Sequence, residues 1–156
     1  MIELNYLTRA TPTVANSVCQ LIYKAYSDDV EGDPATLDPE VWRLCYDVMT
    51  QLRRGCGRVV TATSYGRTSA PVGVAAMDAV GDIVAWYVLP AYRGQGIGAA
   101  LLAKACEHGA HGIWVHEHAR TAVRAVGALR SVGFDRERSG VGGASYYSVA
   151  STTYTA

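Results

Sequence analysis

The chain has 156 residues, of which 49% are hydrophobic and 18% are charged, and its 14 Lys and Arg balance its 14 Asp and Glu. This length and composition predict one globular domain with a sizeable core and exclude a disordered chain. The zero charge balance gives no electrostatic basis for binding nucleic acid or an anionic membrane, and no apolar run approaches the roughly 20 residues of a spanning helix.

The N-terminal part predicts a strand followed by two helices. A strand is expected over Ile2–Thr8, and Thr11–Pro12 then supplies an N-cap and a first helical position. Asp38–Pro39 repeats that signal for a second helix, which runs to about Arg54. The loop between the two helices is acidic, with Asp28, Asp29, Glu31, Asp33 and Asp38.

Three strands and a crossover are expected in the middle of the chain. Arg58–Ser64, Val72–Met77 and the apolar run Ile83–Leu89 have strand composition and predict an antiparallel meander. A helix over Ile97–His108 and a short strand over Ile113–His116 follow. Together with the apolar run they form a βαβ unit, whose two strands should be parallel and whose crossover should be right-handed.

The C-terminal part completes the predicted sheet. A helix over Ala119–Val132 is closed by Gly133, and strands are expected over Phe134–Ser139 and Ala144–Ala150. The whole pattern predicts an α/β (α+β) fold with a mixed, mostly antiparallel sheet of about seven strands and about four helices. It places one domain at residues 1–150 and a frayed tail at residues 151–156.

The first residues and the cysteines bear on location and metal binding. Met1–Asn5 has no basic region followed by an apolar stretch, so we expect no signal peptide. The cysteines lack zinc-ligand spacing, and most lie among apolar neighbours in predicted helices. Free thiols in a reducing compartment are therefore favoured, and with them a cytoplasmic protein without a metal. The four are Cys19, Cys45, Cys56 and Cys106.

The most informative segment is the turn between the apolar run and the next helix. Pro90 ends the strand because it has no N–H for the ladder, and three glycines follow within the six residues Arg93–Gly98. Glycines leave backbone N–H groups uncovered, and the next helix adds its unpaired first-turn N–H groups and the positive end of its dipole. The turn is therefore suited to bind a phosphate or pyrophosphate.

Several interpretations of this turn compete. A P-loop requires Gly-Lys-Ser/Thr at its end, whereas Gly98 is followed by Ala99. A dinucleotide fingerprint lies near the start of a βαβ unit and needs an acidic residue about 20 residues later. A glycine turn without a ligand is a further alternative. The acyl-CoA pattern Arg/Gln-x-x-Gly-x-Gly/Ala fits Arg93–Gly98 at every position, and the segment resembles motif A of the GNAT superfamily of acyl-CoA-dependent N-acyltransferases.

The resemblance extends over nearly the whole chain, and Gly133–Phe134 is similar to a second signature of the superfamily. It implies that acetyl-CoA is the co-substrate and that the thioester lies where the central strand and the next strand splay apart. It is also compatible with a homodimer. The central-strand residues expected beside the pantetheine are Trp86, Val88 and Leu89. The loop residues expected to hold the pyrophosphate are Arg93, Gly94, Gln95, Gly96, Ile97 and Gly98.

Two positions depart from the superfamily's pattern. Ala122 stands where many members have an Asn, and Leu129 stands where many have a Tyr that protonates the leaving thiolate. The remaining candidates for proton transfer are the turn His116–Glu117–His118 and the tyrosines of the central and last strands, of which only one of Tyr146 and Tyr147 can face the site. The histidines of that turn lack the i, i+4 spacing of a helical zinc pair, so no metal is expected.

The resemblance implies an N-acetyltransferase that gives acetyl to a primary amine by direct attack in a ternary complex. A backbone N–H near Val88 would stabilise the oxyanion, with His116 or Glu117 assisting deprotonation and Tyr147 as a candidate acid. The acceptor would be a small molecule or a protein amine, and the acidic loop either attracts a cation or is simply solvated. The alternative is a CoA-binding sensor or interaction module with weakened catalysis.

Overall fold

The order of elements follows the sequence prediction closely. The computed structural model describes residues 2–27, 39–65, 70–116 and 122–149. The strands are β1 (Ile2–Leu7), β2 (Val59–Ser64), β3 (Pro71–Met77), β4 (Asp82–Val88), β5 (Gly112–His116), β6 (Phe134–Ser139) and β7 (Ala144–Val149). The helices are α1 (Pro12–Ser27), α2 (Pro39–Arg54), α3 (Ile97–Glu107) and α4 (Ala122–Val132), with single 3₁₀ turns at Pro90–Tyr92 and Val141–Gly143. The predicted tail at residues 151–156 lies outside the described residues.

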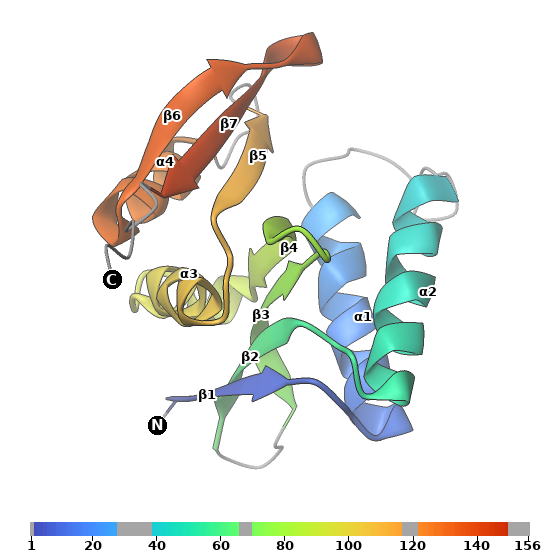
Figure 1. The fold of residues 1–156 in the computed structure, drawn as a ribbon. Coiled ribbons are helices and arrows are strands. Elements are labelled where there is room, and N and C mark those ends of the chain that lie inside the picture. The colour runs from blue at the N-terminus through green and yellow to red at the C-terminus, as the bar shows by residue number, and fades with distance from the viewer. Residues whose placement is uncertain (1, 28–38, 66–69, 117–121, 150–156) are drawn as a thin grey trace, which may run out of the picture.

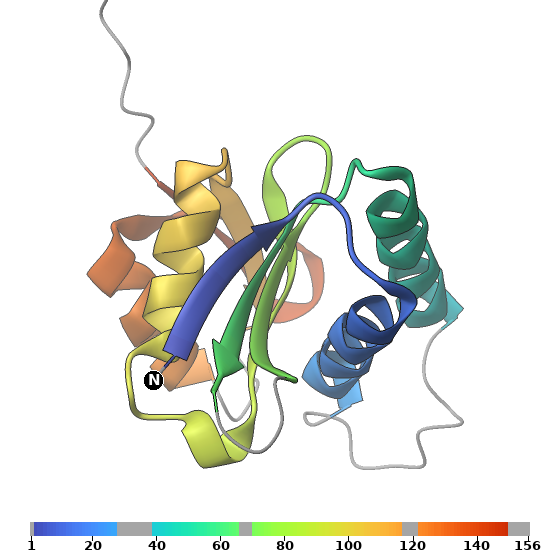
Figure 2. The same ribbon diagram turned by 90° about the horizontal axis from the view of Figure 1, so that it is seen from below.

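One seven-stranded sheet runs through the molecule in the order β1-β2-β3-β4-β5-β7-β6. Every neighbouring pair is antiparallel except β4 and β5, which are parallel as the βαβ prediction required. α1 and α2 cover one face of the strands β1 to β4, and α3 lies on the opposite face (Figures 1 and 2). The predicted mixed, mostly antiparallel sheet is confirmed.

The two helices at the N-terminal end form for reasons visible in the sequence. The Val14 N–H donates to Thr11 Oγ1 at 3.3 Å, which is the predicted N-cap contact. The inner face of α2 repeats apolar residues at helical spacing, and these are buried. They are Val41, Cys45, Val48 and Leu52.

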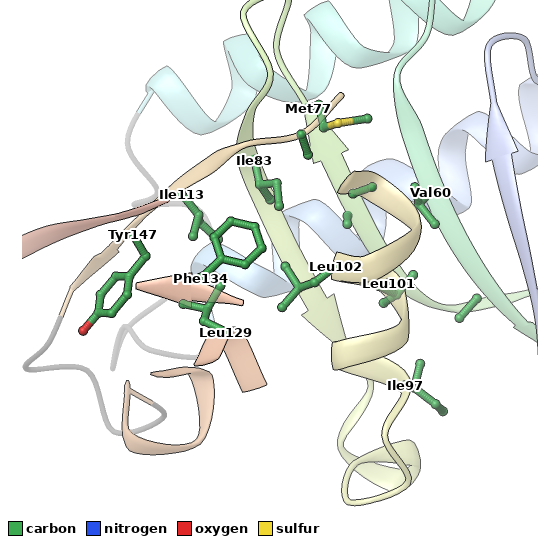
Figure 3. Close-up of a cluster of buried hydrophobic side chains, with 14 of the residues drawn as sticks. Val60, Met77, Ile83, Ile97, Leu101, Leu102, Ile113, Leu129, Phe134 and Tyr147 are labelled. Atoms are coloured by element: carbon green, nitrogen blue, oxygen red, sulfur yellow. The ribbon is translucent and has the colours of Figure 1, made fainter. Parts of the chain in front are cut away.

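Two apolar clusters sandwich the sheet. The cluster beneath α1 and α2 includes Ile22 and Leu52, both completely buried. The cluster on the opposite face packs α3 and α4 against the sheet, with Leu102, Leu129 and Phe134 completely buried (Figure 3). This second cluster reaches from β2 to β7 and therefore joins the two ends of the sheet.

A bulge interrupts β4 at a position that no local sequence pattern marked. Ala76 pairs with Ala85 but Met77 pairs with Ile83, so Val84 is the extra residue on β4. The residues on both sides of it are apolar, so no alternation of polar and apolar side chains marked the change of register. The bulge lies where β4 and β5 begin to separate.

Candidate active site

The paired stretch of β4 and β5 is short. Only Asp82↔Gly112 and Ile83↔Ile113 are in register, and from there β5 turns away to run beside β7 (Figure 1). In the described part of the chain no strand pairs with this edge of β4 beyond Ile83. The strand pairing therefore shows the predicted separation of β4 from β5.

The backbone of β4 offers an N–H group on that unpaired edge. The Leu89 N–H donates to the Val72 carbonyl at 2.9 Å, so Val72 and Leu89 form a hydrogen-bonded pair. Because such pairs alternate along an antiparallel ladder, the N–H groups of Val88 and Trp86 point the other way, towards the β5 side. The Val88 carbonyl also points there, since it accepts a 2.9 Å bond from Arg93 Nε. Val88 and Trp86 therefore present backbone donors at the expected position of the thioester, whereas the Leu89 N–H is already used.

The glycine turn after β4 is open on its outer side. Gly94 and Gly96 have φ of +81° and +79°, a region that favours glycine, and an added Cβ at either position would meet nothing within 4 Å. Gly96 is the N-cap of α3 and gives no side-chain capping bond; the first bond across this end is Ala100 N–H to the Gly96 carbonyl at 3.0 Å. Within the described residues, the N–H groups from Gly94 to Ala99 find no protein acceptor. These donors form a cradle that an anion can enter.

Trp86 fixes the start of α3 on the central strand. Its Nε1–H donates to the Gly98 carbonyl at 3.1 Å, and a Cβ at Gly98 would lie 3.3 Å from the indole ring. The third glycine is therefore explained by a close approach to protein and not by a ligand. The side chain of Trp86 supports the turn, while its backbone faces the β5 side.

Arg93 fastens the turn to the end of β4. Besides its bond to Val88, its guanidinium lies 5.2 Å from the centre of the Tyr87 ring, a cation–π arrangement. The sequence predicted that Arg93 helps hold the pyrophosphate. That role stays a prediction; the described contacts of the Arg93 side chain are with Val88 and Tyr87 at the end of β4.

The two tyrosines of β7 face opposite ways, as adjacent strand residues must. Tyr147 is 2% exposed and belongs to the cluster under α3 and α4, with its hydroxyl turned away from Phe134 (Figure 3). Tyr146 points to the other face and donates to Asp82 Oδ1 at 2.5 Å. Asp82 and Val88 are at opposite ends of β4, about 20 Å apart along the strand. Tyr146 is therefore remote from the Val88 N–H.

Tyr146 is part of a polar group at the start of the parallel strands. Burial, followed by the hydrogen bond to Asp82, raises the pKa of Tyr146, so its hydroxyl stays protonated. His111 Nδ1 lies 3.4 Å from the same hydroxyl, and His111 Nε2 lies 2.5 Å from the Val80 carbonyl. These contacts tie β7, the start of β5 and the turn before β4 together.

The other sequence-predicted residues are placed as follows. His116 is the last residue of β5, opposite Ala144, and Glu117 lies outside the described residues, as does the acidic loop of residues 28–33. Leu129 is completely buried on α4, so the expected tyrosine position holds a core residue. No group of three His, Cys, Asp or Glu suited to a metal exists within the described ranges.

Sequence reasoning missed Tyr26, near the end of α1. Its hydroxyl donates to the Val84 carbonyl at the bulge, 58 residues away in the chain. Desolvation raises the pKa of Tyr26 and keeps the donor neutral. No local pattern marks such a contact, because it depends on where α1 crosses the sheet.

None of the described helices is long and apolar enough to cross a membrane.

None of the curated proteins compared with the chain matches it at a significant level. Among solved structures, 161 chains match. PH1933 from Pyrococcus horikoshii has a TM-score of 0.66 at 17% identity, and a GNAT-family acetyltransferase from Staphylococcus aureus has 0.63 at 14%, each covering 96% of this chain and 98% of its own.

An acetyltransferase of the GNAT family from Streptococcus agalactiae has a TM-score of 0.64 at 12% identity, covering 95% of this chain and 94% of its own. Likenesses at such low identity establish the fold alone. The sequence model of the Acetyltransferase (GNAT) family, in contrast, matches residues 18–134, which include the glycine turn and both parallel strands. The chain therefore belongs to the GNAT acetyltransferase family.

Proposed function

We propose that the protein transfers an acetyl group from acetyl-CoA to a primary amine. The observation that carries the proposal is that two sets of backbone donors lie close together in the chain. They are the open N–H groups from Gly94 to Ala99 and the Val88 N–H on the unpaired edge of β4. The first set suits a pyrophosphate at a helix N-terminus. The second suits a carbonyl oxygen that becomes negative during acyl transfer.

The chain contributes mainly by positioning. Backbone donors at Trp86 and Val88 would align the thioester while the loop from Arg93 to Gly98 holds the pyrophosphate. The amine nitrogen then attacks the carbonyl carbon, and collapse of the tetrahedral intermediate breaks the C–S bond and releases CoA. The Val88 N–H stabilises the oxyanion without a change in its own structure, which is the property that makes such donors effective.

Two proton transfers accompany this step. An alkylammonium of pKa about 10.4 must lose a proton before attack, and the thiolate of CoA, with a thiol pKa of about 8.5, gains one. We assign the first transfer to His116 or Glu117, at and after the end of β5. Tyr147 stays a candidate acid for the second. Bulk water suffices if these groups contribute little, since general acid–base terms amount to about 10²–10⁴ in rate.

The wider context completes the proposal. We expect a cytoplasmic enzyme whose acceptor is a small molecule or a protein amine, and which works without a metal, nucleic acid or membrane. A homodimer is compatible with these expectations.

CoA binding by matched glycine variants tests the loop. Gly96→Val places a branched side chain over the open N–H groups at a φ of +79°, and should weaken CoA binding at least tenfold, or about 1.4 kcal/mol. Gly142→Val is the control, because Gly142 has a φ of +72° and open space in the β6–β7 turn. Calorimetry should detect the loss only in the Gly96 variant. Equal affinity in both folded variants would contradict the assignment of the loop.

A second function is a CoA-binding module without turnover. The buried Leu129 favours it, because the family's usual acid position cannot donate a proton. CoA release with a panel of amines separates the two functions, and the pH dependence of kcat/KM in His116→Ala and Glu117→Gln locates the base. CoA binding without release with any amine would favour the module.

A further inference from the structure

Two cysteines face each other across the helix pair that covers β1 to β4. Cys19 lies on α1 and Cys45 on α2, which run side by side in both views (Figures 1 and 2). Cys19 Sγ is 3.4 Å from the Cys45 carbonyl oxygen, and Cys45 Sγ is 3.8 Å from the Cys19 carbonyl oxygen. Each sulfur thus reaches the backbone of the opposite helix.

These reciprocal contacts place each sulfur beside the backbone of the other cysteine. A sulfur 3.4 Å from a carbonyl oxygen is at most about 6 Å from the Cα of that residue. Disulfides join Cα atoms roughly 4.4–6.8 Å apart. The sulfur-to-backbone contacts in both directions show that α1 and α2 approach each other closely at this pair, as a disulfide requires.

The pair borders a groove that is open to solvent. Both cysteines line a groove of about 940 Å³ formed by residues of α1 and α2, together with Tyr23, Trp42, Tyr46 and Met49. Trp42 and Tyr46 are 54% and 69% exposed, so the groove opens to solvent. Cys19 is partly exposed at this groove, whereas Cys45 is 7% exposed and lies behind it.

The electrostatics of the pair are unequal. The hydrogen bond with Cys19 lowers the pKa of Cys45, whereas the hydrogen bond with Cys45, and then burial, raises the pKa of Cys19. A thiolate is the nucleophile in thiol oxidation. Within the proposal below, Cys45 is the attacking residue and Cys19 the resolving one, and single variants test that order.

We propose that Cys19 and Cys45 form a peroxide-sensitive modification site that closes to a reversible disulfide between α1 and α2. The Cys45 thiolate attacks one peroxide oxygen and breaks the O–O bond, giving a sulfenic acid and hydroxide. The Cys19 sulfur then attacks the sulfenic sulfur, the S–S bond forms, and oxygen leaves as water with the Cys19 proton. Two thiols are oxidised and one peroxide is reduced to two waters.

The bond has a measurable physical consequence. It closes a loop between residues 26 positions apart, which restricts the unfolded chain. For a protein of this size the added stability corresponds to a rise in Tm of roughly 7–14 °C. A thiol reductant should reverse that rise.

The test uses the full chain in a Cys56→Ser background, because the exposed Cys56 is free to form bridges between molecules. After peroxide treatment we expect loss of two of the three remaining thiols, a mass lower by two hydrogens, and a peptide linking residues 19 and 45. Melting with and without reductant should show the change in Tm. None of these readouts depends on acyl transfer, so failure here leaves the proposed function untouched.

Single variants identify the order of the two cysteines. With Cys19→Ser, the Cys45 sulfenic acid should accumulate and react with a 1,3-dione probe; with Cys45→Ser, peroxide consumption should fall at least about tenfold. Cys106→Ser is the control, because Cys106 lies on α3 and burial raises its pKa. Retention of all three thiols, a bridge that includes Cys106, or irreversible oxidation of Cys45 with Cys19 unchanged would each overturn the proposal.

Discussion

The two ends of the sheet are built differently. β1 and β2 pair over six residues, and β5 and β7 over five, whereas β4 and β5, which connect the two ends, pair over two. The β1–β4 end has helices on both faces, and its backbone ladder is nearly continuous. The β5–β7–β6 end is attached through a short seam. The comparison shows that backbone pairing between strands is shortest at the place where the proposed chemistry requires an unpaired strand edge.

Side chains compensate for the short seam. Ile83 and Ile113, which form one of its two register pairs, lie in the same apolar cluster as Phe134 (Figure 3). On the other face, the Tyr146 hydroxyl reaches Asp82 across Gly112, where any Cβ would collide with it. The two ends are thus joined by an apolar core on one face and a polar contact on the other.

The largest expected effect comes from emptying the core at the seam. Phe134→Ala removes a completely buried ring and should lower the free energy of unfolding by about 3–5 kcal/mol. Hydrogen exchange should show amides of β5 and β7 losing more protection than those of β2 and β3, because their ladder is attached by only two pairs. Phe134→Leu, which keeps most of the volume, is the control. Equal loss of protection at both ends would contradict the distinction between them.

A smaller effect is expected from the polar contact. Tyr146→Phe removes a nearly buried hydrogen bond to a carboxylate and should cost about 1.5–3 kcal/mol in chemical denaturation. The matched control is Tyr65→Phe, which removes the same type of bond, to Glu3, at the opposite end of the sheet. Tyr65 is 54% exposed, so water replaces the lost partner and stability should hardly change. Similar losses of stability in the two variants would show that burial at the seam does not increase the contribution of this hydrogen bond to the free energy of unfolding.

The same contact predicts a pH dependence. Burial and Asp82 raise the pKa of Tyr146 above the value of about 10 that a tyrosine has in the unfolded chain. The native state therefore keeps a proton that the unfolded state loses, and stability falls as pH rises through this range. Between about pH 9 and pH 11 the advantage of the wild type over Tyr146→Phe should shrink. Denaturation at several pH values checks this, and a constant advantage would argue against the raised pKa.

The smallest effect concerns two helix N-termini. Thr11 caps α1 with its hydroxyl, whereas Gly96 leaves the N-terminus of α3 without a side-chain cap. Thr11→Ala should cost about 1 kcal/mol of stability and leave CoA affinity unchanged. Thr11→Ser, which retains the hydroxyl, should recover most of the loss. A change in CoA affinity in Thr11→Ala would contradict this, because it would mean that the cap of α1 also positions the glycine turn.

The sequence by itself determined the elements and the loop. Caps such as Thr11, the apolar stripe of α2 and the glycines at 94 and 96 act over a few residues, so their consequences can be predicted locally. The open N–H groups of the turn follow from the same short-range logic. For this reason the order of strands and helices and the parallel crossover were predicted and confirmed.

Only the tertiary structure decided which groups meet. The bulge at Val84 was hidden because the strand is apolar throughout, and the partners of Tyr146, Tyr26 and Cys19 lie 64, 58 and 26 residues away in the chain. Such contacts depend on how helices cross the sheet and where β5 leaves β4. The positions of the helices and of β5 depend on packing over the whole core and not on local propensity, so no pattern of neighbouring residues could have revealed these contacts.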